Sequence, residues 1–249
     1  MSEVHSYNHP PIVEAIFDVF TESPLAIELD AIEKLHSQIS DQYTKPQPRH
    51  QFESKFEIRD GNAVNSETIN LGVDGYLFWA NDHCQVVQFR KDGFSFNRLK
   101  PYQGWDGHFP EVLKLWEIFS RQFRPSAITR TALRFINQIE IPDLQGDLKK
   151  YLKNPPQAPD AGNMGSIENF ISKIQIAFQG SNVKVNVTQT YGQKIKPNVR
   201  PLILDIDAYS VERYESETDQ VAGVFRTLRS VKNTVFRQSI TEETEALFQ

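Results

Sequence analysis

Two periods of apolar residues alternate along the chain. Where every second side chain is apolar, as in a strand with one buried face, the pattern predicts strands. These lie at 11–20, 51–59, 63–72, 75–80, 84–91, 94–99, 127–142, 168–179, 182–190 and 201–212. Apolar residues three and four positions apart form one stripe and predict helices. The helices lie at 28–42, 109–123 and 147–154, from Ser216 onward and, as a short segment, after Ser239.

The order of these elements predicts the fold class. It reads strand, helix, several antiparallel strands and helix, and then approximately the same again. We therefore expect an α+β fold with antiparallel sheets covered by long amphipathic helices. Residues 1–249 should form a single compact domain with two pseudo-repeat β-α-β(n)-α halves, 10–125 and 126–240. The sequence leaves open whether the halves share one saddle-like or barrel-like sheet or pack as separate sandwiches.

Turn residues divide the strands. Residues 157–166, rich in Pro, Gly, Asn and Asp, predict a surface loop. The stretch QVVQFRKDGFSFNRLK at 85–100 predicts a hairpin, because Asp92-Gly93 suits a type I′ turn. A two-residue loop there pairs Phe89 with Phe96. One face of the hairpin then carries Val87, Phe89, Phe94 and Phe96, and the other carries Gln88, Arg90, Ser95 and Asn97.

Polar residues also follow the other long strands, on the side away from the apolar residues. An antiparallel sheet usually has one solvated side, so this face is either an ordinary wet surface or the lining of a groove. The candidate ligand-binding residues are Gln88, Arg90, Asn97, Arg130, Arg134, Lys173 and Lys184. The acidic residues of the same faces are Glu14, Asp18, Asp205 and Asp207.

These residues support two predictions of function. The first is a cytoplasmic binding or adaptor protein of unknown ligand that uses a polar sheet face. The alternative is a metal-dependent, phosphate-handling hydrolase of tunnel type that acts on a nucleotide or polyphosphate. In that case the four acidic residues hold Mg²⁺ and the basic residues bind phosphate oxygens.

The segment KPYQGWDGHF at 100–109 offers a further interaction site. Trp and Tyr on loops are frequent anchors of protein interfaces, which makes Tyr102, Trp105 and Phe109 candidates. They could equally plug the end of the sheet beneath the following helix, and we expect this of Trp105. His108, within the same polar segment, is expected to be solvated.

Composition narrows the classes of function. The chain has 249 residues, 39% of them hydrophobic, and a formal net charge of −5, which disfavours a nucleic-acid binder. Its one cysteine, Cys84, and the lack of a signal-like or membrane-spanning apolar run predict a cytoplasmic protein. Motifs for binding phosphates, dinucleotides or catalytic zinc are absent, so no cofactor is expected and catalytic residues stay unknown. The expected partner is a protein or a second copy of the chain, without membrane contact.

Four stretches together resemble a known family. They are PPIVEAIFDV near the start, QFRKDGFSFNRLKPYQGW, ALRFINQIEIP, and FRQSIT near the end. In this order and spacing they are similar to a sporadically distributed, uncharacterised prokaryotic protein family of similar length. The resemblance covers nearly the whole chain, and it supplies no activity or catalytic residues for transfer. A patchy distribution would imply mobile or defence-associated genes.

Overall fold

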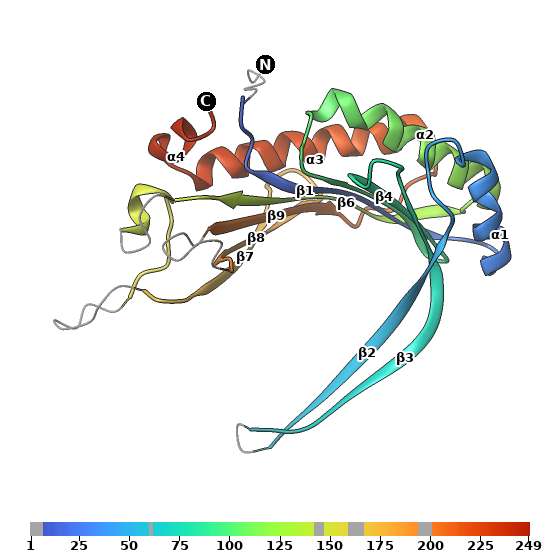
Figure 1. Ribbon diagram of the computed structural model, residues 1–249, viewed down its shortest axis with the longest axis horizontal. Coiled ribbons are helices and arrows are strands. Elements are labelled where there is room, and N and C mark those ends of the chain that lie inside the picture. The colour runs from blue at the N-terminus through green and yellow to red at the C-terminus, as the bar shows by residue number, and fades with distance from the viewer. Residues whose placement is uncertain (1–6, 60–61, 142–146, 159–166, 194–200) are drawn as a thin grey trace.

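Nine strands form one antiparallel sheet in the computed structural model (Figure 1). The structure describes residues 7–59, 62–141, 147–158, 167–193 and 201–249, without the side chains of 54–59 and 62–67. Most of the predicted loop 157–166 lies outside these residues. The strands are β1 (Ile12–Glu22), β2 (Gln47–Arg59), β3 (Asn62–Trp79), β4 (Gln85–Arg90), β5 (Gly93–Leu99), β6 (Ala127–Ile139), β7 (Ile171–Ala177), β8 (Val183–Tyr191) and β9 (Leu202–Ser210).

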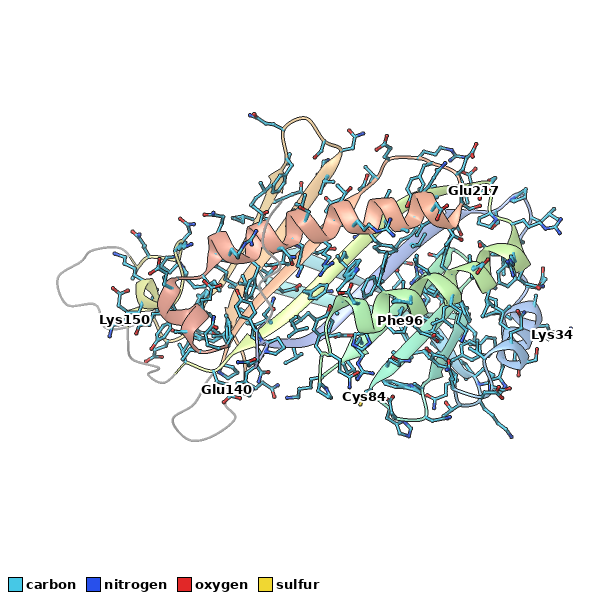
Figure 2. The ribbon with its side chains drawn as sticks, turned by 90° about the horizontal axis from the view of Figure 1, so that it is seen from above. Lys34, Cys84, Phe96, Glu140, Lys150 and Glu217 are labelled. Atoms are coloured by element: carbon cyan, nitrogen blue, oxygen red, sulfur yellow. The ribbon has the colours of Figure 1, made fainter. Side chains whose placement is uncertain are left out.

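The helices and 3₁₀ turns are α1 (Leu29–Glu33), η1 (Lys34–Gln38, a 3₁₀ turn), α2 (Trp105–Phe123), η2 (Leu148–Lys150, a 3₁₀ turn), α3 (Thr218–Ser239) and α4 (Glu242–Ala246). The two long helices, α2 and α3, lie over one face of the sheet (Figures 1 and 2). The predicted α+β class, with several sheets covered by long helices, is therefore wrong. One large sheet dominates the fold, because β1 and β6 pair directly and join the strands of both halves. Strand periodicity identifies buried faces, but it does not identify neighbouring strands.

The strand order β2-β3-β4-β5-β1-β6-β9-β8-β7 is similar on both sides of its centre. Each half begins with a central strand, β1 or β6. Its remaining strands then run from an outer edge back to that central strand, and α2 or α3 follows. The two halves therefore share one sheet rather than forming separate sandwiches. A duplication of residues 10–125 and 126–240 stays a prediction.

The core lies between the sheet and the helices. The apolar stripe predicted for 109–123 consists of Val112, Leu115, Trp116, Phe119 and Phe123; the first four are fully buried and Phe123 is partly buried. The ring centroids of Phe94 and Trp116 are 6.1 Å apart. Phe17 of β1 contacts Trp105 of α2 and Phe225 of α3, with ring centroids 5.3 and 5.4 Å apart. The central strand is thus packed against both long helices.

The 85–100 hairpin has the predicted faces but a different register. Phe89 pairs with Phe94 rather than Phe96, and Arg90 pairs with Gly93. The loop is therefore Lys91-Asp92. A side chain on Gly93 would overlap the carbonyl oxygen of Val19, so this glycine permits the close approach of β5 to β1. The shift of two positions leaves every side chain on its predicted face.

Two other local predictions are wrong. The turn expected between 72 and 75 is absent, because β3 continues from residue 62 to 79 and pairs with β2 in a long hairpin. Helix α2 begins at Trp105, four residues earlier than expected, after Gly104 with a φ of 94°. His108 consequently lies inside the helix and is buried, not solvated. Trp105 and Phe109 are buried as well, in agreement with the plugging interpretation.

Candidate functional site

The seven candidate ligand-binding residues and the four acidic residues all lie on one face of the sheet. We call it the open face, because it is opposite α2 and α3 (Figure 1). Cross-strand partners share a face, and Arg134 of β6 pairs with Asp207 of β9, which pairs with Asn186 of β8. On the other side of the centre, Ser95 pairs with both Asp18 and Gln88. The eleven residues come from seven adjacent strands, β4 to β7 in the sheet order.

Asp18 of β1 lies at the centre of a network of ion pairs. Its Oδ1 accepts a hydrogen bond of 3.0 Å from Nη1 of Arg90, and its Oδ2 accepts one of 3.1 Å from Nη1 of Arg130. Arg90 also donates from Nε to Asp92 over 2.9 Å, and Arg130 donates from Nη2 to Asp207 over 3.4 Å. The network joins β4, β1, β6 and β9. Such charge-assisted bonds position guanidinium groups across several strands.

Two aromatic residues complete this network. The ring of Phe20 lies 4.7 Å from Cζ of Arg90 and 5.6 Å from Cζ of Arg130, measured to the ring centroid. Tyr209 lies 5.1 Å from Cζ of Arg130 in the same way. These distances allow cation–π attraction. Sequence reasoning overlooked both rings, although each stands two positions from a candidate, Asp18 or Asp207, and so shares its face.

Burial shifts the pKa values within the network. Burial, the largest effect on Arg90, lowers its pKa, but attraction to Asp18 and Asp92 outweighs it and the net pKa is raised. Burial raises the pKa of Asp207, although Arg130 and Asn186 oppose this shift. The Arg90 guanidinium thus stays charged, while the Asp207 carboxylate becomes protonated at a higher pH than a solvated aspartate.

The remaining candidates form smaller groups. Arg134 binds both carboxylate oxygens of Asp205, at 2.8 and 2.6 Å. Asn97 donates to Glu14 over 2.7 Å and accepts from Gln88 over 3.2 Å. Lys173 of β7 and Lys184 of β8 are exposed. Neither lysine side chain forms an ion pair or hydrogen bond with any residue that the structure describes.

The four acidic residues do not come together as a metal-binding site. Asp18, Asp205 and Asp207 face arginines, and Glu14 faces an amide. In the described part of the chain, no group of three or more His, Cys, Asp or Glu residues could hold a metal ion. None of the described helices is long and apolar enough to cross a membrane.

Comparison with known proteins adds no family. No protein-family model matches the chain, and no curated protein matches it. Its similarity to an uncharacterised prokaryotic family therefore stays a prediction. Any assignment of function depends on the geometry of the chain itself.

Proposed function

We propose that the chain is a cytoplasmic binding protein that holds a partner protein on the open face of its sheet. One observation carries this proposal. Eleven polar residues from seven adjacent strands share a face that no described helix covers. Their arginines and carboxylates are already arranged across strands by hydrogen bonds, so binding needs little reorganisation of these side chains.

The chemistry of the partner follows from the charges that are not paired. Most open-face arginines and carboxylates neutralise one another, whereas Lys173 and Lys184 have no described partner. Their strands, β7 and β8, form one end of the sheet, where Ile171 is 77% exposed. Ile171 lies on the open face, because it pairs with Thr190, which pairs with Ile203 of β9. We expect an acidic segment with an apolar contact residue to bind this end of the face.

The hydrolase alternative has no structural observation in its favour. Its acidic residues are bound by arginine or amide side chains. An arginine bound to a carboxylate is also less available to a phosphate oxygen.

The experiment compares two double variants by affinity capture from an extract of the source organism, followed by calorimetry with each purified partner. Lys173→Glu with Lys184→Glu reverses the unpaired charge and should weaken binding by at least about ten-fold. The control is Lys149→Glu with Lys150→Glu, which makes the same change of charge on exposed residues outside the sheet. Hydrogen exchange should show that the partner protects β7, β8 and β9.

Two results would refute the proposal. One is unchanged binding by the Lys173→Glu, Lys184→Glu variant, with protection on the helix side. The other is that the purified chain forms a dimer, and that the Lys173→Glu, Lys184→Glu variant is monomeric whereas the control variant remains dimeric. That result would assign the face to a second copy of the chain.

A further inference from the structure

A separate site lies on the opposite side of the sheet. It is a pocket of about 520 Å³ between the start of α2, the second half of α3 and the end of β6, and it is also lined by Tyr7, Asn8, Pro10 and Pro11 before β1 and by Ile12, the first residue of β1. This volume lies in the range of small-molecule sites. Aromatic side chains form much of its wall, namely Tyr7, Tyr102, Trp105, Phe135 and Phe236. The side chains of Phe135 and Arg134, which are consecutive residues of β6, point to opposite faces of the sheet. The sheet therefore separates this pocket from the open face.

Lys232 of α3 brings a buried positive charge to this pocket. The residue is only 8% exposed, and its Nζ lies 3.8 Å from the centroid of the Phe135 ring. Its side chain makes no hydrogen bond or ion pair with the residues that the structure describes. Burying an ammonium group without an anionic partner is unfavourable. Burial, followed by repulsion from Arg229, accordingly lowers the pKa of Lys232 to about 7.

Two further positive groups face the same space. Arg229 lines the pocket one helical turn before Lys232, and its Cζ lies 4.7 Å from the centroid of the Trp105 ring. It has no ion pair among the described residues. The first turn of the 19-residue helix α2 also lines the pocket, and no side chain caps it. Its free backbone N–H groups and helix dipole favour an anion.

The charged side chains that line the pocket are also mostly positive. Arg229, Lys232 and Arg237 line the pocket, against Asp106 as the one carboxylate among its described lining residues. The pocket is also larger than a simple inorganic anion requires, and aromatic side chains form part of its wall. A ligand that matches this pocket should therefore combine an anionic group with an apolar part.

We propose that this pocket binds a small organic anion. Lys232, Arg229 and the amide groups at the start of α2 would bind its carboxylate or phosphate group. Its apolar part would lie against Tyr102, Phe135 and Phe236. This site is independent of the partner-binding face proposed above, and either proposal can fail without the other.

Titration calorimetry with three probes tests the proposal on the full chain. Phenyl phosphate and benzoate carry the two anionic groups on a similar ring, and benzyl alcohol is the neutral counterpart. We expect one-to-one binding of at least one anion, and binding of benzyl alcohol at least about ten-fold weaker. The anion that binds more tightly identifies the preferred head group.

Variants of one helix provide the matched comparison. Lys232→Met and Arg229→Gln should each weaken binding of the preferred anion by at least about ten-fold, because each removes a charge-assisted contact. Arg226→Gln removes an exposed arginine one turn earlier on α3, outside the pocket lining, and should leave binding within about two-fold of the original. Circular dichroism confirms that each variant is folded.

Three outcomes would overturn the proposal. They are no saturable binding of either anion up to about 10 mM, equal affinity for the preferred anion and benzyl alcohol, or equal weakening by Arg226→Gln and the pocket variants. The Lys173→Glu, Lys184→Glu variant should bind the anion normally. A loss there would place anion binding on the open face and would also overturn the assignment to this pocket.

Discussion

Lys232 buries its ammonium group where no described carboxylate neutralises it. Its pKa falls from an ordinary 10.5 to about 7 in the folded chain. Below pH 7 the amine is charged in both the folded and the unfolded state, so the cost of burying the charge lowers the free energy of unfolding in full. Between about pH 7 and 10.5 only the unfolded state keeps the proton, and stability therefore rises with pH across this window.

Replacement of Lys232 by methionine should accordingly stabilise the fold. We expect Lys232→Met to raise the free energy of unfolding by on the order of 2–4 kcal/mol at pH 6. The gain should shrink as the pH approaches 10. Urea denaturation at pH 6 and 9 measures both values. The control Lys149→Met changes an exposed residue and should leave the free energy of unfolding the same at both pH values. An equal gain at pH 6 and pH 9 for Lys232→Met would contradict the explanation.

Sequence patterns located the open-face residues better than the pocket. Alternation assigns Arg134 and Asp207 to one face without any knowledge of strand order, because the side-chain period of a strand is two. Lys232 carried a signal that was overlooked. It stands four residues after Leu228 on the buried stripe of α3, where a charged residue is unusual. The wall that surrounds it could not be predicted, because it combines α3, α2, β6 and the segment before β1.

At the scale of elements, one glycine sets the spacing of two central strands. Gly93 begins β5, and a Cβ there would overlap the backbone of Val19 in β1. Gly93→Ala should therefore destabilise the protein by about 3 kcal/mol, because the strands must separate or shift. Thermal and urea unfolding measure the loss.

Gly180 is the matched control for this substitution. It has a φ of 74°, but a Cβ there would meet no atom within 4 Å. Gly180→Ala should cost about 1 kcal/mol, from backbone strain alone. Equal losses at Gly93 and Gly180 would mean that the strand contact contributes nothing. The same contact explains why the predicted register of the hairpin was wrong. Asp92-Gly93 was interpreted as a turn, whereas Gly93 is needed because β1, which is distant in sequence, packs closely against it.

On the scale of the whole molecule, the order of elements was predictable and their assembly was not. The alternating runs gave most strands, including β1, β6, β8 and β9, within a few residues. The fold class was wrong because it depends on the pairing of β1 with β6, whose residues are more than 100 positions apart, as in Phe17 with Leu133. Both edges of a strand carry the same backbone groups, so local patterns do not select the neighbour.

In this assembly the outer β2–β3 hairpin should contribute less to the stability of the fold than the central strands do. Among the strands that the structure describes, the outer part of the β2–β3 hairpin forms backbone pairs only within the hairpin, since β4 pairs with β3 from Gly75 onward. Figure 1 shows this hairpin extending from the body of the sheet. Replacing residues 52–71 by Asn-Gly should therefore preserve cooperative unfolding and shift the melting temperature by less than about 5 °C.

The opposite result is expected at the centre. Leu133 of β6 is fully buried beside Phe17 at the β1–β6 pairing, and Leu133→Asp buries an unpaired carboxylate in the core. This variant should lose cooperative unfolding, as followed by circular dichroism and calorimetry. If removal of the outer hairpin also abolished the transition, β2 and β3 would belong to the folding unit formed by β1 and β6, and the hairpin could not act as an independent projection beside the open face.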